Sequence, residues 1–353
     1  MAYATINDPS EHFGTILYTG TGTTGHPVVG VNFQPDWVWI KNKASGKDHV
    51  IIDSSRGVTK QMHTNNTNTE STVSGLTSFN SNGFTLGSDG GANARSGAHV
   101  AWNWKANGGT RTTFSESGAN PAGGHQANTT AGFSIVDYTG TGSSGGTIAH
   151  GLGAVPEFFV VKGRSIGDSW TAYHHKNTSA PETDMVKLDE DGATQDNSVF
   201  WNDTAPTSTV FTVDGNNGEP KVNQDGQTYV AYCFTGIQGY SKFGKYVGNA
   251  NADGPFIYTG FKPAWMIIKR TDSANSWYLV DITRDSANIA DHELEANNTG
   301  AEATGTDRLD ILSNGFKIRT SGAAYNADDG TYIYIAFAES PFVTSNGGPN
   351  NAQ

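Results

Sequence analysis

Residues 260–270 read GFKPAWMIIKR, and this pattern of a proline, five mostly apolar residues and a lysine occurs three times in the chain. The other copies are NFQPDWVWIKN at residues 32–42 and GAVPEFFVVKG at residues 153–163. On a strand, alternate side chains point to opposite faces, and here both faces are apolar. The pattern predicts three central β-strands covered on both faces, each begun by a proline. We expect the core anchors of these strands to be Trp37, Phe158 and Trp265.

The repeated stretch belongs to a longer unit. A tyrosine and a Gly-rich turn precede each copy, and a second strand and an apolar closing strand follow it. We align the closing strands as HVAWNW (99–104), YVAYCF (229–234) and YIAFAE (334–339), which places Phe337 opposite Trp102 in the alignment. Because the markers recur in the same order, we predict an all-β protein of three tandem β-sandwich domains, jelly-roll or lectin-like, of about 100 residues each. A small closed barrel is the alternative.

The predicted organisation has three domains and three connecting or terminal segments. Residues 107–130, rich in Gly, Ser, Thr and Asn, are expected to be a flexible linker, so that domain 1 is more independent than domains 2 and 3. We expect a short helix in each of 180–191 and 290–298. The predicted boundaries are an N-terminal arm at 1–12, domains at 13–106, 131–238 and 239–342, the linker at 107–130 and a C-terminal tail at 343–353.

Composition narrows the functional classes. The chain has 353 residues, 44 of them Gly, and only 16% are charged, which favours short strands and turns over long helices. The net charge of −12 argues against nucleic-acid or anionic-membrane partners. No stretch approaches the roughly 20 apolar residues of a membrane-spanning helix. Cys233 is the single cysteine, which excludes an intramolecular disulfide, and we expect it to be buried.

No motif of a catalytic site occurs: GxSxG, the P-loop and HExxH are all missing from the sequence. We therefore expect a protein that is not an enzyme and needs no cofactor. Three loops rich in Asp, Asn and Gly leave calcium open, because calcium binds six to eight oxygen atoms. Ordinary turn chemistry is the competing interpretation. The candidate ligands are Asp189, Asp191, Asp214 and Asp328.

An Asp and an Arg recur at the end of the second strand. Asp53 and Arg56 in DSSR correspond to Asp281 and Arg284 in DITR, whereas domain 2 has His174 and Asn177 at the same places. A bidentate Asp–Arg pair can fix a turn. Since domain 2 has neither charge, we interpret the pairs as structural and not as a shared site.

Several longer stretches resemble a family of structural proteins encoded by marine tailed bacteriophages, including phages of cyanobacteria and of SAR11-type bacteria. The similar stretches include INDPSEHF, QPDWVWIKN, VAWNWKANGG, PETDMVKL, QGYSKFG and LSNGFKIR, and the likeness covers nearly all of residues 5–343. The resemblance implies a virion location and a role as tail fibre or other surface protein. It implies other virion proteins as partners and a host-surface glycan as a further candidate, and it leaves self-association open. Alternatives are a capsid decoration protein anchored by the arm, and a free carbohydrate-binding lectin.

Overall fold

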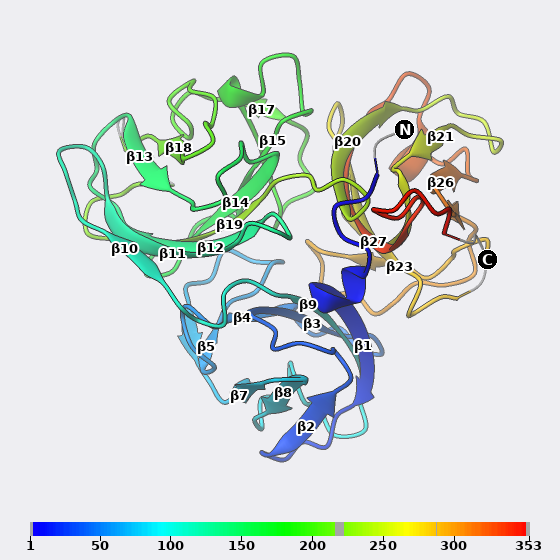
Figure 1. The fold of residues 1–353 in the computed structure, drawn as a ribbon, viewed down its shortest axis with the longest axis horizontal. Helices are drawn as coiled ribbons and strands as arrows, with labels where there is room; N and C mark the ends of the chain where they lie inside the picture. The colour runs from blue at the N-terminus through cyan, green and yellow to red at the C-terminus, as the bar shows by residue number, and fades with distance from the viewer. Residues whose placement is uncertain (1–2, 216–221, 287, 351–353) are drawn as a thin grey trace.

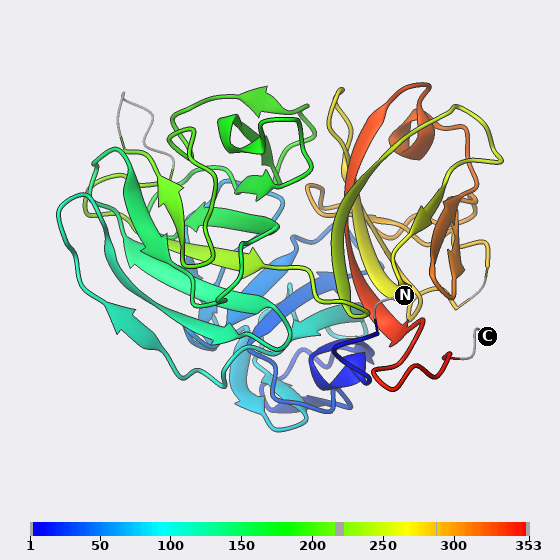
Figure 2. The ribbon, with the colours of Figure 1, turned by 45° about the horizontal axis from the view of Figure 1, so that its top comes forward.

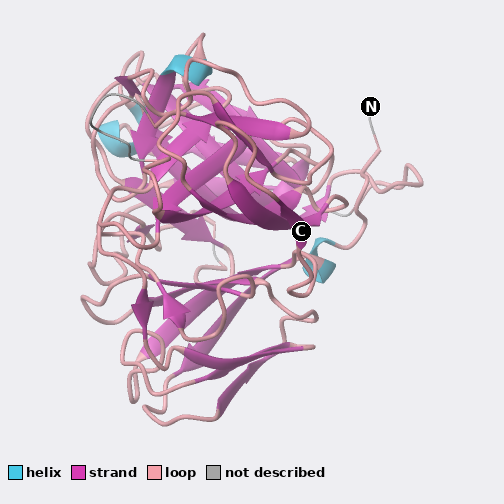
Figure 3. Ribbon diagram, turned by 90° about the vertical axis from the view of Figure 1, so that its left-hand side faces the viewer, coloured by secondary structure: helices cyan, strands magenta, loops and turns pink. Residues whose placement is uncertain are grey.

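Strands and loops make up almost the whole molecule (Figures 1 and 3). The computed structural model describes residues 3–215, 222–286 and 288–350. Residues 216–221 of the acidic loop at 213–226, the first two residues of the arm and the last three of the tail lie outside this description. The all-β class predicted from the sequence is confirmed, and every sheet is antiparallel.

Unit 1, residues 13–104, contains two main sheets. The order in the first is β1 (Phe13–Thr19), β9 (Ala98–Trp104), β3 (Trp37–Asn42) and β4 (Val50–Asp53). The second contains β2 (His26–Val29), β8 (Gly83–Leu86) and β7 (Leu76–Asn80). A short pair is formed by β5 (Lys60–Gln61) and β6 (Ser71–Thr72).

Unit 2, residues 112–234, has a longer first sheet. Its order is β10 (Thr112–Phe114), β11 (Ala122–Asn128), β12 (Phe133–Thr139), β19 (Thr228–Phe234), β14 (Phe158–Gly163), β15 (Thr171–His174), β16 (Asp184–Lys187) and β17 (Gln195–Asp196). The second sheet contains β13 (Gly146–Ala149) and β18 (Val210–Val213).

Unit 3, residues 241–341, repeats the arrangement. Its first sheet has the order β20 (Ser241–Val247), β27 (Thr331–Pro341), β22 (Phe261–Arg270), β23 (Trp277–Asp281) and β24 (Leu294–Glu295). The second contains β21 (Phe256–Tyr258), β26 (Gly315–Ile318) and β25 (Leu309–Leu312). The helices are the 3₁₀ turns Pro9–Glu11 and Pro181–Thr183 and the single turn α1 (Ala323–Asn326).

The three units share one strand order. In each, the strand that carries the repeated motif lies between the closing strand and the second strand, as in β9-β3-β4, β19-β14-β15 and β27-β22-β23. Cross-strand partners refine the alignment of the closing strands. Phe337 lies opposite Trp265 as Trp104 lies opposite Trp37, so our alignment of 334–339 was wrong by two residues. Ile335, opposite Ile267, takes the place of Trp102, which lies opposite Trp39.

Each first sheet is apolar on both faces because it packs in two directions. One face packs on the smaller sheet of its own unit, for example around Val38, Ile40 and Phe84 in unit 1. The other face contributes to a core shared by all three units, which form three lobes around a common centre (Figures 1 and 2). The expected anchors Trp37, Phe158 and Trp265 are buried in this shared core.

Aromatic rings fill the shared core. The Trp37 ring lies 4.5 Å from that of Tyr232 in unit 2, and the Trp104 ring lies 5.4 Å from that of Trp265 in unit 3. The void at the centre measures only about 30 Å³, and its lining is almost wholly apolar. At native packing density, such a core couples the stabilities of all three units.

The flexible-linker prediction for 107–130 is wrong. Strands β10 and β11 occupy this segment, and β11 pairs with β12 over seven residues, from Ala122 to Asn128. The expectation that domain 1 is the independent one is wrong for the same reason and because of the shared core. The Gly-rich composition allowed a strand here because the backbone of β11 pairs with β12.

The N-terminal arm and the C-terminal tail pack against the molecule and against each other. The Ala4 amide donates to the Val343 carbonyl (3.2 Å) and the Asn7 amide group donates to the Ser345 hydroxyl (2.7 Å). Ile6 and Pro9 are buried. The described residues of the arm predicted at 1–12 are therefore packed against the rest of the chain.

The helices expected in 180–191 and 290–298 are also wrong. The first segment holds one 3₁₀ turn followed by β16, and the second holds β24. Both strands extend the first sheet of their unit. Within the described residues, no helix is long and apolar enough to cross a bilayer.

Because the three units share one core, we predict a single cooperative unfolding transition. Trp37→Ala should lower the free energy of unfolding by about 3–5 kcal/mol, the usual cost of emptying a large buried aromatic site. Urea titrations followed by tryptophan fluorescence and by far-UV circular dichroism should give the same midpoint.

The matched control is Leu17→Ala on β1, whose side chain is 43% exposed, and its effect should stay within about 0.5 kcal/mol. Two separate transitions, or a loss well under 1 kcal/mol for Trp37→Ala, would contradict the shared core.

Candidate functional site: the seams between the units

The lysine that ends each repeated motif is fully buried at a seam, by which we mean the contact between two units. Lys41, Lys162 and Lys269 each donate to a carbonyl of their own unit six residues further on. Each also donates to a carbonyl of a neighbouring unit. These second partners are Thr299 for Lys41 (2.8 Å), Thr67 for Lys162 (3.0 Å) and Asp191 for Lys269 (2.8 Å).

A second set of donors follows the same direction around the ring. The Trp170 indole donates to the His63 carbonyl (2.7 Å) and the Trp277 indole to the Lys187 carbonyl (2.8 Å). At the equivalent place His49 accepts from the Trp39 indole through Nδ1 and reaches the Glu295 carbonyl through Nε2 (3.0 Å). Unit 1 thus donates to unit 3, unit 2 to unit 1 and unit 3 to unit 2, so the contacts close a ring.

The burial of these lysines has an electrostatic consequence. Desolvation lowers the pKa of Lys41, Lys162 and Lys269 to about 8 each. Backbone carbonyls accept hydrogen bonds from each ammonium group. A buried ammonium group is tolerated only when such acceptors replace its water.

The Asp–Arg pairs also lie in seams. Arg56 Nε is 2.5 Å from Asp53 Oδ2, and all of both side chains is buried. Tyr232 of unit 2 donates its hydroxyl to the same Asp53 oxygen (2.7 Å), and Glu70 connects Arg56 (3.2 Å) to Arg164 of unit 2 (2.9 Å). The pair therefore fixes a turn and also binds the neighbouring unit.

The second pair repeats this geometry between units 3 and 1. Arg284 Nε is 2.5 Å from Asp281 Oδ2, and the Trp102 indole of unit 1 donates to that oxygen (2.9 Å). Glu302 connects Arg284 (3.1 Å) to Lys43 of unit 1 (3.1 Å). The structure thus brings each predicted pair together and adds partners that spacing within one unit could not reveal.

The third seam explains why unit 2 has neither charge. His174 lies opposite Phe158 as Asp53 lies opposite Trp37, and it faces unit 3. In unit 3 the place of Trp102 and Tyr232 is taken by Ile335, which has no polar hydrogen to donate to a carboxylate. A buried Asp at 174 would therefore lack that partner, and its desolvation would be uncompensated.

Neutral groups occupy the place of the Asp–Arg pair in this seam. His174 Nδ1 accepts from the Lys176 amide, and Nε2 then donates to the Tyr334 carbonyl of unit 3 (3.2 Å). Burial lowers the His174 pKa to about 3, so the ring is uncharged at neutral pH. Asn177 accepts from the Thr194 hydroxyl (2.7 Å), and the Thr194 amide donates to the Thr271 carbonyl of unit 3 (2.9 Å).

The four candidate calcium ligands are spread over separate places in the part of the chain that the structure describes. Asp189 accepts from the Trp170 amide (2.8 Å), and Asp191 offers its backbone carbonyl to Lys269. Asp214 follows β18 and is buried, whereas Asp328 follows α1 at the surface. These four carboxylates do not build one common site, and Asp189 already has a structural partner in the backbone at the start of β15.

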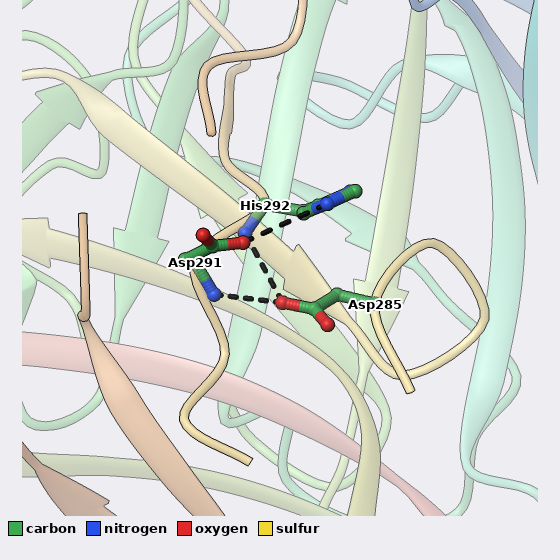
Figure 4. A group of neighbouring side chains, drawn as sticks. All are labelled: Asp285, Asp291 and His292. Carbon is green, nitrogen blue, oxygen red and sulfur yellow. Dashed lines mark hydrogen bonds and ion pairs between the residues drawn. The ribbon is translucent and has the colours of Figure 1, made fainter. Parts of the chain in front are cut away.

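A different acidic group was missed by sequence reasoning. Asp285, Asp291 and His292 offer ligand atoms that all lie within 4.8 Å of one another (Figure 4). One carboxylate oxygen of this group already accepts hydrogen bonds, because the Asp291 amide (2.7 Å) and the His292 amide (3.3 Å) donate to Asp285 Oδ2. The Asp285 carboxylate thus shapes the loop after β23. The spacing of these residues resembles no metal motif, so the sequence offered no signal for them.

The surface has a groove where units 2 and 3 meet. Its volume is about 640 Å³, and a neighbouring hollow of about 320 Å³ shares much of its lining. The shared lining residues are His175, Lys176, Lys242, Phe243 and Tyr258. Unlike the polar groups buried in the seams, several of these side chains are accessible to a partner.

We predict that the seam pairs contribute strongly to stability. Asp53→Asn should destabilise the protein by about 3–5 kcal/mol, because it leaves Arg56 buried without its carboxylate. The control is Asp272→Asn, which breaks the surface pair between exposed Asp272 and half-buried Arg270 and should cost less than about 1 kcal/mol. Equal losses in urea denaturation would contradict the structural role of the buried pair.

The seam lysines predict a distinctive pH dependence. Lys162→Met should destabilise the protein by about 1–3 kcal/mol at neutral pH, because two carbonyls lose their donor. The folded pKa of Lys162, about 8, lies below its ordinary value of 10.5. The pH-dependent part of its contribution to stability is therefore complete above 10.5 and is lost as the pH falls through about 8. The hydrogen bonds of the ammonium group to the two carbonyls remain below that pH.

The difference in unfolding free energy between wild type and Lys162→Met should accordingly widen when urea titrations at about pH 7 are repeated at about pH 10. Lys47→Met, at an exposed lysine, should show no such widening. A difference that stays constant or narrows with rising pH would refute the assignment.

Comparison with known proteins identifies a family and gives no function for it. The model of a domain of unknown function, DUF7483, matches residues 8–341. No curated protein and no solved structure matches the chain. The matched range includes all three units and every seam between them, so one family model covers the ring as a whole. The chain belongs to the family of the DUF7483 domain, a domain of unknown function.

Proposed function

We propose that this protein is a non-enzymatic structural subunit of a tailed-phage particle, in a tail fibre or similar appendage with an adhesive surface. The observation that carries the proposal is that the buried charged groups of the seams bind other units of the chain. The Asp–Arg pairs and the buried lysines, which are the groups most suited to chemistry, bind neighbouring units of the same chain. Such groups rigidify a body and are closed to a substrate.

The likeness of residues 5–343 to structural proteins of marine phages supports the virion location. A rigid ring also suits an appendage, because binding residues work best when a fixed scaffold positions them. The open groove between units 2 and 3 supplies an accessible surface of that kind. Adhesion to a host-surface glycan is the function that we assign to it.

A capsid decoration protein is the second candidate, and the ring of three like units favours it. Three similar units around one centre would fit a position of local threefold symmetry on a shell, where each unit meets an equivalent neighbour. The copy number in the particle separates the two candidates.

The test is quantitative mass spectrometry of purified particles, normalised to the major capsid protein. A tail or appendage subunit should be present at on the order of ten copies per particle, and a decoration protein at on the order of hundreds. A protein that is absent from particles but binds glycans in solution would contradict both candidates and favour a free lectin.

A further inference from the structure

The groove between units 2 and 3 is open because the chain leaves it uncovered. It lies between the end of β15 in unit 2 and strands β20 and β21 of unit 3. At the equivalent place between units 1 and 2, β11 covers the edge strand β12, and Gln126 donates to the hydroxyls of Ser54 and Ser55 (2.7 Å each). Among the described strands, β20 pairs with β27 alone.

The seam between units 3 and 1 has a smaller hollow of about 250 Å³. Part of its lining comes from Ser10 in the arm and from Val31. The three equivalent places therefore differ. The one between units 1 and 2 is covered by a hairpin, the one between units 3 and 1 has a hollow of about 250 Å³, and the one between units 2 and 3 has a groove of about 640 Å³. The open place is therefore the one of the three where a ligand has room to bind.

Aromatic side chains at the groove are a property of unit 3 alone. Phe256 and Tyr258 lie on the same face of β21, and they are 47% and 46% exposed. Cross-strand pairing aligns Ile257 with Val28 and Ile148, so the residues equivalent to Tyr258 are Val29 and Ala149. Two exposed aromatic rings in one groove leave apolar surface in contact with water and contribute little to folding, so they point to a ligand with apolar faces.

The lining of the groove carries an excess of positive charge in a chain of net charge −12. Lys176 and Lys245 are exposed, and Lys242 lies with Nζ 5.3 Å from the centre of the Tyr258 ring. Glu157 is the one carboxylate among the described residues that line the two hollows. Lysines that gather in one groove of an acidic protein favour an anionic ligand.

The edge of β20 is not free to accept another strand along its length. His175 of unit 2 binds the Phe243 carbonyl through Nε2 (2.8 Å), and Phe243 lies in the middle of β20. A peptide that paired with β20, as β11 pairs with β12, would have to displace this ring. Strand addition therefore fits the groove less well than a ligand that binds side chains.

We propose that this groove binds an acidic polysaccharide, a chain of pyranose rings that carry carboxylate or sulfate groups. The apolar faces of the sugar rings would cover Phe256 and Tyr258, and Lys176, Lys242 and Lys245 would contact the anionic groups. This inference rests on the proposed adhesive function and names its ligand class.

The test is isothermal titration of the full-chain protein with three oligosaccharides of equal length: an alginate, a sulfated carrageenan and a neutral dextran. We expect binding of at least one acidic probe, weakened by salt as the ionic contacts are screened, and no comparable binding of dextran. The two acidic probes separate carboxylate from sulfate recognition.

Two variants and two matched controls locate the site. Tyr258→Ala and Lys176→Gln should each weaken binding by about three- to tenfold. Val29→Ala, at the position of unit 1 equivalent to Tyr258, and Lys47→Gln, at another exposed lysine, should bind as the wild type does. All four lie at exposed positions, so unchanged thermal midpoints would exclude misfolding as the cause.

The proposal is overturned if neither acidic probe binds, if dextran binds equally well, or if the groove variants bind like the controls. Binding of a peptide with the sequence of Ala122–Asn128 in place of a glycan would also overturn it and assign the groove to a strand. The particle count is independent of these outcomes. A protein present in particles that binds no acidic glycan keeps its structural role, and one absent from particles that binds glycan keeps the groove.

Discussion

The whole arrangement depends on the buried lysine of each repeated motif, because one of the carbonyls that accept its hydrogen bonds belongs to another unit. A lysine in a protein interior needs hydrogen-bond acceptors in place of water. For Lys162, one acceptor is the backbone carbonyl of Asp168 in its own unit. Thr67 of unit 1 supplies a further carbonyl. The repeated motif thus builds a strand that is incomplete without its neighbour, electrostatically through the lysine and hydrophobically through Trp37, Phe158 and Trp265.

The same dependence explains the one irregular seam. Asp53 and Asp281 each accept from an aromatic side chain of the next unit, Tyr232 and Trp102. Where the neighbour presents Ile335, the carboxylate gives way to His174, which binds a backbone carbonyl instead. A polar group on one side of a seam and its donor on the other therefore change together, as burial of unpaired charge requires.

Much of the fold could be predicted from the sequence, but the partners of the buried faces could not. The alternation in DWVWIK correctly predicted a strand covered on both faces, yet nothing local says that the second cover is another unit. The two-residue error at 334–339 has a physical reason, because YIYIAF is apolar at every position and a shift of two leaves each side chain on the same face.

Composition misled where backbone pairing decides the structure. Residues 107–130 are polar and Gly-rich, yet β11 is held by the exposed edge of β12, which propensity cannot reveal. The segments 180–191 and 290–298 contain strands and no α-helix because the edges of β15 and β23 were available for pairing. Of the seam contacts, the Asp–Arg pairs could be predicted from the sequence, because both residues lie within one turn. The residues of the neighbouring units that donate to Asp53 and Asp281 could not, because each is 179 positions away in the sequence.

Joining three similar units in one polypeptide has a consequence that three separate copies would not have. An assembly of identical subunits must repeat every surface feature at each symmetric position, so any cover or opening appears three times. Within the described residues, a hairpin such as β10–β11 precedes the edge strand in unit 2 only, and exposed aromatic residues like those of β21 occur at this place in unit 3 only. Because the three units are joined in one chain, their interiors can stay similar while their exposed surfaces differ, so that a ligand can bind at one position and not at the other two.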